Sequence, residues 1–309
     1  MPDGLTTMAE PVIAVVGPTA AGKSELALRL ALQIGGEIVN ADSMQLYAGM
    51  DVGTAKLPIT QRRGVPHHLL DIWDVRQTAS VAGYQRLARD AIADIQRRGR
   101  VPVLAGGSGL YLRAALDRLE FPGTDPALRA RLEAELARSG PAALHQRLTG
   151  LDPEAAGAIL PSNGRRIVRA LEVIEVSGRP FSATLPGYES LYPVIQLGLA
   201  VDRAELDTRI AARTGQMFDG GLVEEVARLE RAGLREGKTA SRALGYAQVL
   251  RFLAGDRTLA EAHAETVLAT RRFVRRQESW FRRDPRVTWL PAGAADRGDL
   301  LGRALGRVS

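Results

Sequence analysis

The 309-residue chain contains no cysteine. This absence excludes disulfide bridges, zinc–thiolate sites and cysteine nucleophiles. Histidine is scarce too, and the four histidines are not spaced as metal ligands. No apolar run reaches the length of a membrane span, and the amino-terminal segment lacks the basic and apolar regions of a signal peptide. Together these absences predict a cytoplasmic globular protein that does not associate with a membrane.

Lysine is nearly missing as well: Lys23, Lys56 and Lys238 are the only three, so the formal net charge of +6 comes almost entirely from arginine. A general bias toward arginine codons would account for the abundance but not for the clustering. The segment from Thr270 to Arg286 carries seven arginines against two acidic residues. A local excess of this kind favours a polyanionic partner.

The amino-terminal third alternates short β-branched runs with helical spacing. We expect strands at residues 12–17, 37–43, 67–72, 101–107 and 193–202. Strands that alternate with helices predict an α/β fold with a parallel sheet covered by helices.

The pattern changes near Thr124. From there to about residue 190 only helical spacing is found, beginning with a helix that has Asp125 as its cap and Gly140 as its stop. We therefore predict an all-helical inserted domain at 124–190, within a core formed by 10–123 and 191–309. After Asp202 we expect mostly helix, closing with a long helix over about 259–283.

The sequence "GPTAAGKS" at residues 17–24 matches the phosphate-loop motif and lies between a predicted strand and a predicted helix. Its backbone N–H groups and the helix dipole would face an anion. Lys23 adds a point charge, and the Ser24 hydroxyl is suited to hold Mg²⁺. The motif indicates a P-loop NTPase-like core. It does not indicate which molecule carries the phosphate.

A nucleotide hydrolase also needs acids that position water and metal. Asp71 and Asp202 are the candidates, and we interpret both as turn or helix-cap residues because no second acid follows them. Asp42 lies at the carboxyl end of the second predicted strand, at the sheet edge where ligands of parallel sheets bind. A carboxylate there can accept a proton from a substrate. The alternative is that Asp42 only caps the next turn.

At this point the chain resembles a family, the bacterial-type tRNA dimethylallyltransferases, also called tRNA isopentenyltransferases. The resemblance covers residues from about Val12 to Leu290. It rests on these motifs in this order: "GPTAAGKS", "NADSMQLYAGMDVGTAK", "VPHHLLDI", "LAGGSGLYLRAAL", "RRIVRALEV", "RALGY" and "RRFVRRQESWFRRD".

The resemblance implies that the bound phosphate is the diphosphate of dimethylallyl diphosphate, with Mg²⁺ assisting. The dimethylallyl group would go to the exocyclic amine of the adenine on the 3′ side of the tRNA anticodon. Asp42 would be the general base, with Ser108 and Lys23 as further catalytic residues. The diphosphate would contact Gly17, Pro18, Thr19, Ala20, Ala21, Gly22, Lys23 and Ser24. The tRNA anticodon stem-loop would contact Asp42, Ser43, Met44, Gln45, Ser108, Arg129, Arg165, Arg166, Ile167, Val168, Arg169, Arg242, Arg271, Arg275 and Arg282.

Some positions depart from the family pattern. "PSNG" at 161–164 replaces Pro-Asn-Asp-Pro and leaves the cap of the next helix open, and Ala247 stands where a basic residue is usual. Ser108 replaces threonine and keeps the hydroxyl. We interpret Trp280 and Phe281 as core residues rather than base-stacking ones.

Other functions remain possible from the residues alone. A small-molecule P-loop kinase would require ATP and would leave the arginine-rich carboxyl-terminal helix unused. A prenyltransferase of free adenine nucleotides would leave the helical insertion unused. A non-catalytic RNA-binding protein would not need Lys23, Ser24 and Asp42 in one crevice. We expect a monomer that uses tRNA and dimethylallyl diphosphate.

Overall fold

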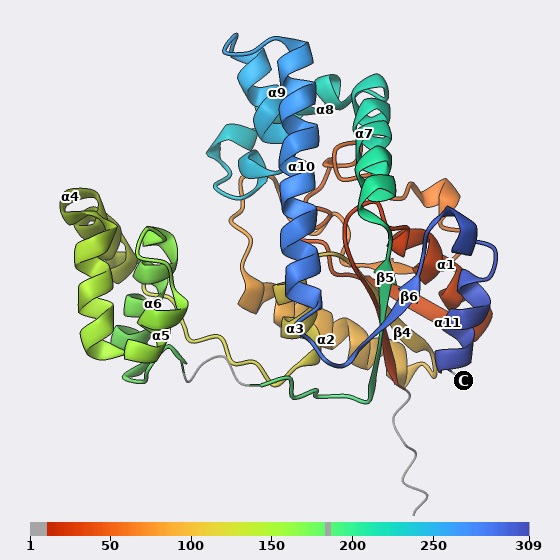
Figure 1. Cartoon of the computed structure of the whole chain (residues 1–309), viewed down its shortest axis with the longest axis horizontal. Helices are drawn as coiled ribbons and strands as arrows, with labels where there is room; N and C mark the ends of the chain where they lie inside the picture. Colours follow the sequence, from red (N-terminus) through yellow and green to blue (C-terminus); the bar gives the residue numbers. More distant parts are fainter. Residues whose placement is uncertain (1–10, 183–186, 309) are drawn as a thin grey trace, which may run out of the picture. The chain divides into compact units, whose positions relative to one another are not determined.

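The computed structural model describes residues 11–182 and 187–308 (Figure 1). The chain divides into two compact units. The larger unit comprises the chain up to Leu116 and from Ser190 onward, and the smaller unit spans Asp117–Glu189. The smaller unit thus begins at Asp117, whereas the sequence pattern places the start of the insertion at residue 124.

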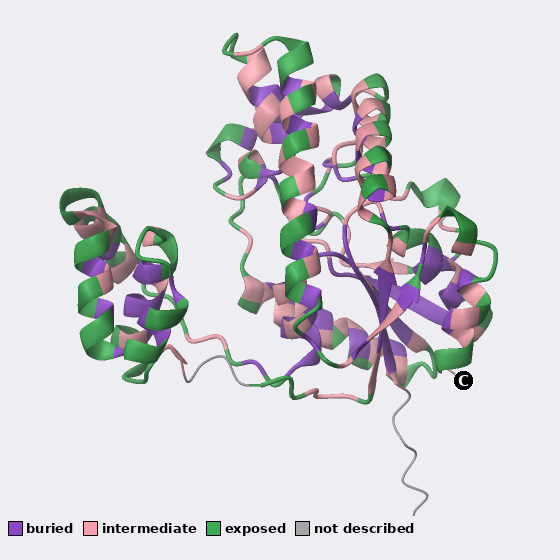
Figure 2. Cartoon of the chain, viewed as in Figure 1, coloured by how far each residue is buried: buried purple, intermediate pink, exposed green. Residues whose placement is uncertain are grey.

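The larger unit contains a six-stranded sheet in the order β3-β2-β4-β1-β5-β6, and every strand pair is parallel. The strands are β1 Val12–Val16, β2 Gly36–Asn40, β3 His67–His68, β4 Val101–Ala105, β5 Val194–Ala200 and β6 Val287–Pro291. The central strand β1 is buried along its whole length, as its β-branched composition predicts (Figure 2). The predicted parallel α/β sheet is confirmed.

Helices cover both faces of this sheet (Figure 1). On one face lie α1 (Lys23–Ile34) and α11 (Leu300–Val308), which share an apolar cluster with the sheet. On the other lie α2 (Val81–Arg97) and α3 (Gly109–Leu116). Each face is therefore closed to water, and the loops at the carboxyl ends of the strands are left to form a site.

Two sequence predictions about the sheet are wrong in detail. The third strand has two residues instead of six, because Leu69 and Asp71 adopt positive φ angles of 61° and 59° that end the extended run. The chain after Asp202 is mostly helical, as expected, but the long helix does not close it, since β6 and α11 follow. The strand β6 is a short edge strand paired only with β5, so it carries little of the alternating pattern that marks longer strands.

Three helices stand beyond the carboxyl ends of the strands: α7 Arg203–Asp219, α8 Leu222–Arg231 and α9 Tyr246–Leu253. The long helix α10 (Leu259–Phe281) runs from beside them down to α3 and leads into β6 (Figure 1). The long helix α10 begins at a capping box formed by Thr258 and Glu261. Short 3₁₀ turns are η1 Ile59–Gln61, η3 Leu234–Glu236, η4 Ala240–Arg242 and η5 Ala294–Asp296.

The smaller unit is helical where it is described, with α4 Pro126–Leu151, α5 Pro153–Ala158 and α6 Gly164–Ser177. The predicted stop at Gly140 is a break inside α4, since this glycine has φ 74° and ψ 168° and the helix resumes at Pro141. The Asn163 side chain accepts a hydrogen bond from the Arg166 N–H and so caps α6. This resolves the open question of the "PSNG" segment. No helix in the described part of the chain is long and apolar enough to cross a membrane.

Candidate active site

The phosphate loop connects β1 to α1, as predicted. Ala20 and Gly22 have φ angles of 68° and 98°, in the left-handed region that turns backbone N–H groups inward. The Lys23 Nζ donates a hydrogen bond to the Pro18 carbonyl at 2.7 Å. The lysine head is thus folded over the loop, where an anion bound to the loop would meet it.

The environment of Lys23 changes its acidity. Burial lowers the pKa of Lys23 from 10.5 to about 8; Asp42 opposes this shift and Arg213 adds to it. Burial also lowers the pKa of Arg213, again with Asp42 acting in opposition. Lys23, Arg213 and Asp42 therefore interact at one place, with two cations for one anion. This excess of positive charge suits a phosphate ligand.

Asp42 lies two residues past β2, and Asn40 fixes the backbone there. The Asn40 side chain accepts from the Asp42 N–H at 2.9 Å and donates to the Asp42 carbonyl at 3.0 Å. The Asp42 Oδ1 accepts from the Met44 N–H at 2.9 Å. This carboxylate therefore does cap a turn, with one oxygen. Its Oδ2 has no hydrogen-bond partner among the described residues and is available to a ligand.

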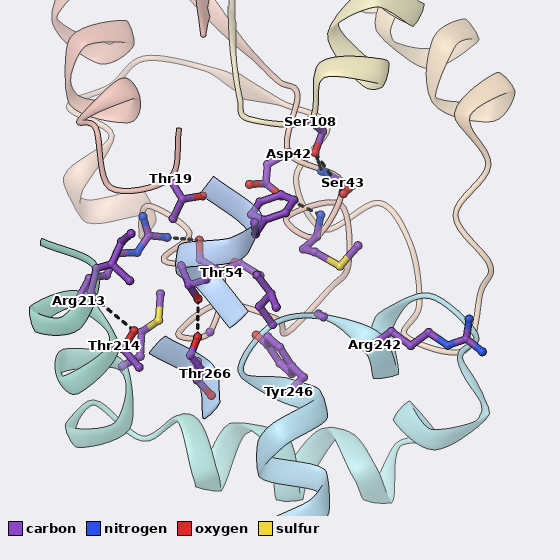
Figure 3. A pocket seen from close by; sticks show the side chains of 18 of the residues that line it. Thr19, Asp42, Ser43, Thr54, Ser108, Arg213, Thr214, Arg242, Tyr246 and Thr266 are labelled. Carbon is purple, nitrogen blue, oxygen red and sulfur yellow. Dashed lines mark hydrogen bonds between the residues drawn. The ribbon is translucent and has the colours of Figure 1, made fainter. Parts of the chain in front are cut away.

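Ser108 lies beside Asp42, in the loop after the neighbouring strand β4. Its Oγ accepts from the Ser43 N–H at 3.2 Å and lies 3.3 Å from the Ser43 Oγ. Figure 3 shows Asp42, Ser43 and Ser108 on one wall of a pocket. Ser108 and Asp42 therefore lie together at the carboxyl edge of the sheet.

These groups open into a cavity of about 320 Å³ that has a polar part and an apolar part. Thr19 of the phosphate loop, Asp42, Ser108 and Arg213 belong to its polar part. The apolar part includes Met44, Ile210, Met217, Leu244 and Phe273. Such a lining suits a small ligand with an anionic end and a short hydrocarbon end.

Arg213 on α7 is a site residue that the sequence did not reveal. Its Nη2 donates to the Thr54 carbonyl at 3.3 Å, and its buried Nε has no hydrogen-bond partner among the described residues. A buried donor without a partner is costly, and an anion in the cavity would satisfy it. No local motif surrounds Arg213, so only the fold could identify it.

Glu225 on α8 is a second missed residue. Its carboxylate accepts from the N–H groups of Asp51, Val52 and Gly53 at 3.0, 2.8 and 3.1 Å, and from the Tyr246 hydroxyl at 2.5 Å. A Cβ on Gly53 would lie 2.5 Å from the Tyr246 ring, so glycine is required there. The loop at 51–54, which lines the cavity through Gly53 and Thr54, is thereby fixed. The sequence signal for Glu225 was the presence of an acidic residue on the otherwise apolar face of α8.

The other predicted residues are distributed unevenly. Met44 and Arg242 also line the cavity, with Arg242 exposed and pointing away from the pocket in Figure 3. Gln45 does not line it, because its side chain donates to the Thr54 carbonyl. Ser24 is exposed at the start of α1. Asp202 caps α7 and Asp71 lies in a turn, paired with Lys56 at 2.5 Å, so their interpretation as cap and turn residues is confirmed.

In the smaller unit, two predicted tRNA contacts are paired internally. Arg129 and Arg169 both form ion pairs with the fully buried carboxylate of Glu172. Ile167 and Val168 are buried in the core of this unit, which corrects their assignment as tRNA-contacting side chains. Arg165 and Arg166 are exposed on α6.

On α10, Arg271 contacts Asp207 at 3.7 Å and Arg275 is exposed, as is Arg282 directly after the helix. None of these three lines the cavity. Arg276 does, although the sequence did not single it out. Phe281 is buried as predicted. The interpretation of Trp280 as a core residue is wrong, because it is 40% exposed.

Comparison with known proteins agrees with this geometry. A family model described as "IPP transferase" matches residues 45–284. A protein of Thermobifida fusca named tRNA dimethylallyltransferase is 68% identical over 96% of this chain and 94% of its own length. A Streptomyces coelicolor protein of the same name is 67% identical over 96% of this chain and 95% of its own length.

Solved structures are similar over almost the whole chain. A full-length tRNA isopentenylpyrophosphate transferase from Bacillus halodurans is 39% identical, with a TM-score of 0.72 and 97% of each chain covered. An isopentenylpyrophosphate transferase from Staphylococcus epidermidis is 31% identical, with a TM-score of 0.71 over 97% of this chain and 99% of its own. With a phosphate loop, a carboxylate and an apolar cavity in one place, the chain belongs to the tRNA dimethylallyltransferase, or IPP transferase, family of enzymes.

Proposed function

We propose that this enzyme transfers the dimethylallyl group of dimethylallyl diphosphate to the exocyclic amine of the adenine that follows the tRNA anticodon. The observation that carries the proposal is the single cavity that joins Thr19 of the phosphate loop, Arg213, Asp42 and an apolar wall. A diphosphate on the loop and a five-carbon chain against Met217 and Phe273 would use both parts of this lining.

In the reaction, a bond forms between the adenine nitrogen and the first carbon of the prenyl group as the carbon–oxygen bond to diphosphate breaks. The departing diphosphate gains negative charge, which Lys23 and Arg213 stabilise. Asp42 takes the proton from the amine through its second carboxylate oxygen. The Met44 N–H holds the first oxygen, so the base is already oriented.

Magnesium fits this arrangement. Ser24 begins α1 beside Lys23 and is exposed, so its hydroxyl is open to a cation that also binds the diphosphate oxygens and water. No cluster of three or more acidic or histidine side chains suitable for a metal ion occurs in the described residues. We therefore propose that Mg²⁺ enters with the diphosphate, where it neutralises charge on the leaving group.

We propose the anticodon stem-loop as the RNA partner. The target adenine must leave its stack to reach Asp42, which lies inside a cavity. Exposed arginines supply contacts for the RNA backbone: Arg165 and Arg166 on α6, Arg275 on α10, Arg282 directly after α10, and Arg242 at the pocket. Because residues of one chain form the entire cavity, we propose that the enzyme is a monomer. We also propose that it acts on tRNA in the cytoplasm.

The decisive experiment is incubation with radiolabelled dimethylallyl diphosphate, Mg²⁺ and either total tRNA, AMP or ATP. We expect label in tRNA alone, and none with Lys23→Ala. Label in AMP would instead indicate a prenyltransferase of free nucleotides. Sustained ATP turnover without prenyl transfer would support a kinase or ATPase. Binding of tRNA with no transfer to any acceptor would support a non-catalytic RNA-binding protein.

A further inference from the structure

One buried side chain on α10 contacts two loops of the site at once. The Oε1 of Gln277 accepts a hydrogen bond from the Thr19 N–H at 2.9 Å, and its Nε2 donates to the Gly107 carbonyl at 2.9 Å. Gln277 is 5% exposed. Its amide thus joins the phosphate loop to the loop that carries Ser108, although these segments lie far apart in the sequence.

The fit around this amide is tight. A Cβ on Gly107 would lie 2.2 Å from the Gln277 Nε2, so no larger residue fits without moving the glutamine. Three residues further along α10, on the same face of the helix, Trp280 packs against Gly109, where a Cβ would lie 2.1 Å from the indole. Two side chains of α10 therefore pack against the loop at 107–109 and fix its position.

The two hydrogen bonds of Gln277 form a bridge between the loops, and this bridge changes which backbone N–H groups the phosphate loop can offer a ligand. A phosphate loop holds its anion with backbone N–H groups, but the Thr19 N–H is already used by Gln277. The position of Thr19 is then set by α10 and not by the ligand. Ser108, next to Gly107, is set by the same amide. Gln277 does not itself line the cavity, yet its amide connects the phosphate loop to the loop that carries Ser108.

We propose that Gln277 is a positioning residue that holds the phosphate loop and the Ser108 loop at the separation needed for prenyl transfer. This inference rests on the proposed function. A displacement of about 1 Å between reacting groups can cost about 100-fold in rate. Loss of the bridge should therefore reduce the rate of transfer much more than the affinity for either substrate.

The test compares Gln277→Met, which keeps the length of the side chain but neither hydrogen bond, with Gln33→Met on the exposed surface of α1. We expect kcat to fall about 10- to 100-fold in Gln277→Met. The dissociation constants for pyrophosphate and for tRNA should change by less than about threefold. Gln33→Met should match the parent. A purely structural role would lower the melting temperature while leaving kcat of the folded protein intact.

A double-mutant cycle adds a second readout. Because Gln277 acts through the Ser108 loop, Ser108→Ala should cost much less in the Gln277→Met background than in the parent. If Gln277→Met does not fold, the same measurements are made on Gln277→Glu. Its carboxylate can accept a hydrogen bond from the Thr19 N–H but cannot donate one to the Gly107 carbonyl. A kcat within twofold of the parent, or strictly additive effects in the cycle, overturns the proposal.

A failure of the proposed function can be distinguished from a failure of the inference about Gln277. If the parent transfers no prenyl group to tRNA, the proposed function is wrong. Hydrogen exchange at the Thr19 amide still tests the bridge, since it needs no substrate. The exchange should be faster in Gln277→Met than in the parent, and equal rates in both proteins refute the bridge independently of activity.

Discussion

The Asp42 carboxylate accepts a hydrogen bond from the Met44 N–H at 2.9 Å, and this contact uses only one of its two oxygens. The two roles considered for Asp42, as a turn cap and as a general base, are therefore compatible. The cap orients the carboxylate, and Asp42 lines the cavity. A substitution that keeps the cap but removes the basicity can separate these roles.

We expect Asp42→Asn to lower single-turnover prenyl transfer by about 10²- to 10⁴-fold. The asparagine oxygen can still accept from the Met44 N–H, so the loop and the affinity for tRNA should change little. Asp202→Asn is the matched control, because Asp202 caps α7 outside the site. Rapid-quench measurement of transfer tests this. A rate within a few-fold of the parent would show that Asp42 is not the general base.

The pKa of Lys23 predicts a pH dependence. Its value of about 8 means that the free enzyme carries the ammonium below pH 8 and loses it above. If the ammonium binds the diphosphate as proposed, kcat/KM for the donor should fall as the pH rises through about 8. Lys23→Arg stays charged and should remove this fall. A profile that is identical in the parent and in Lys23→Arg would exclude Lys23 as its source.

The sequence predicted those parts of the site that short motifs encode. The phosphate loop and Asp42 follow strands at fixed positions, and the topology of a parallel sheet then brings them to one edge. The neighbouring strand β4 leads to Ser108 at the same edge, a residue that the sequence assigned to the site only through the family resemblance. None of these predictions needed knowledge of side-chain packing.

The residues that were missed depend on contacts between distant segments. Glu225, Gln277 and Arg213 each lie on a helix, and each contacts a loop more than 150 positions away in the sequence. The helical period shows only that such a residue faces inward. It cannot show whether that side chain contacts the backbone of a loop or another side chain in the core. Trp280 was misplaced because its spacing along α10 is the same as that of residues on the buried face of this helix.

We expect the exposed arginines of α10 to bind the phosphate backbone of tRNA. Replacing Arg272 and Arg275, which are exposed and do not line the cavity, by alanine should weaken tRNA binding and flatten the log–log salt dependence by about 0.7 to 0.9 for each phosphate that is no longer neutralised. Affinity for pyrophosphate should stay unchanged. Replacing Arg86 and Arg97 on α2 removes the same charge from another exposed surface and is the control. Equal salt slopes in both double variants would assign the α10 arginines to solvent.

Glu225 gives a prediction about stability. Glu225→Gln keeps the shape of the side chain but turns an amide donor toward a group of backbone N–H donors and the Tyr246 hydroxyl. Since hydrogen bonds to a buried charged group are strong, we expect the free energy of unfolding to fall by about 2 kcal/mol. Glu224→Gln changes the neighbouring exposed residue and should stay within about 0.5 kcal/mol of the parent.

Urea unfolding of the three proteins measures these differences, and prenyl transfer at low urea reports on the cavity. Because Gly53 and Thr54 line the cavity and the first of them is held directly by Glu225, the Glu225→Gln variant should also transfer more slowly while still folded. A variant as stable and as active as the parent would mean that the loop at 51–54 keeps its position without this carboxylate, so that Tyr246 and the packing around Gly53 suffice to hold it.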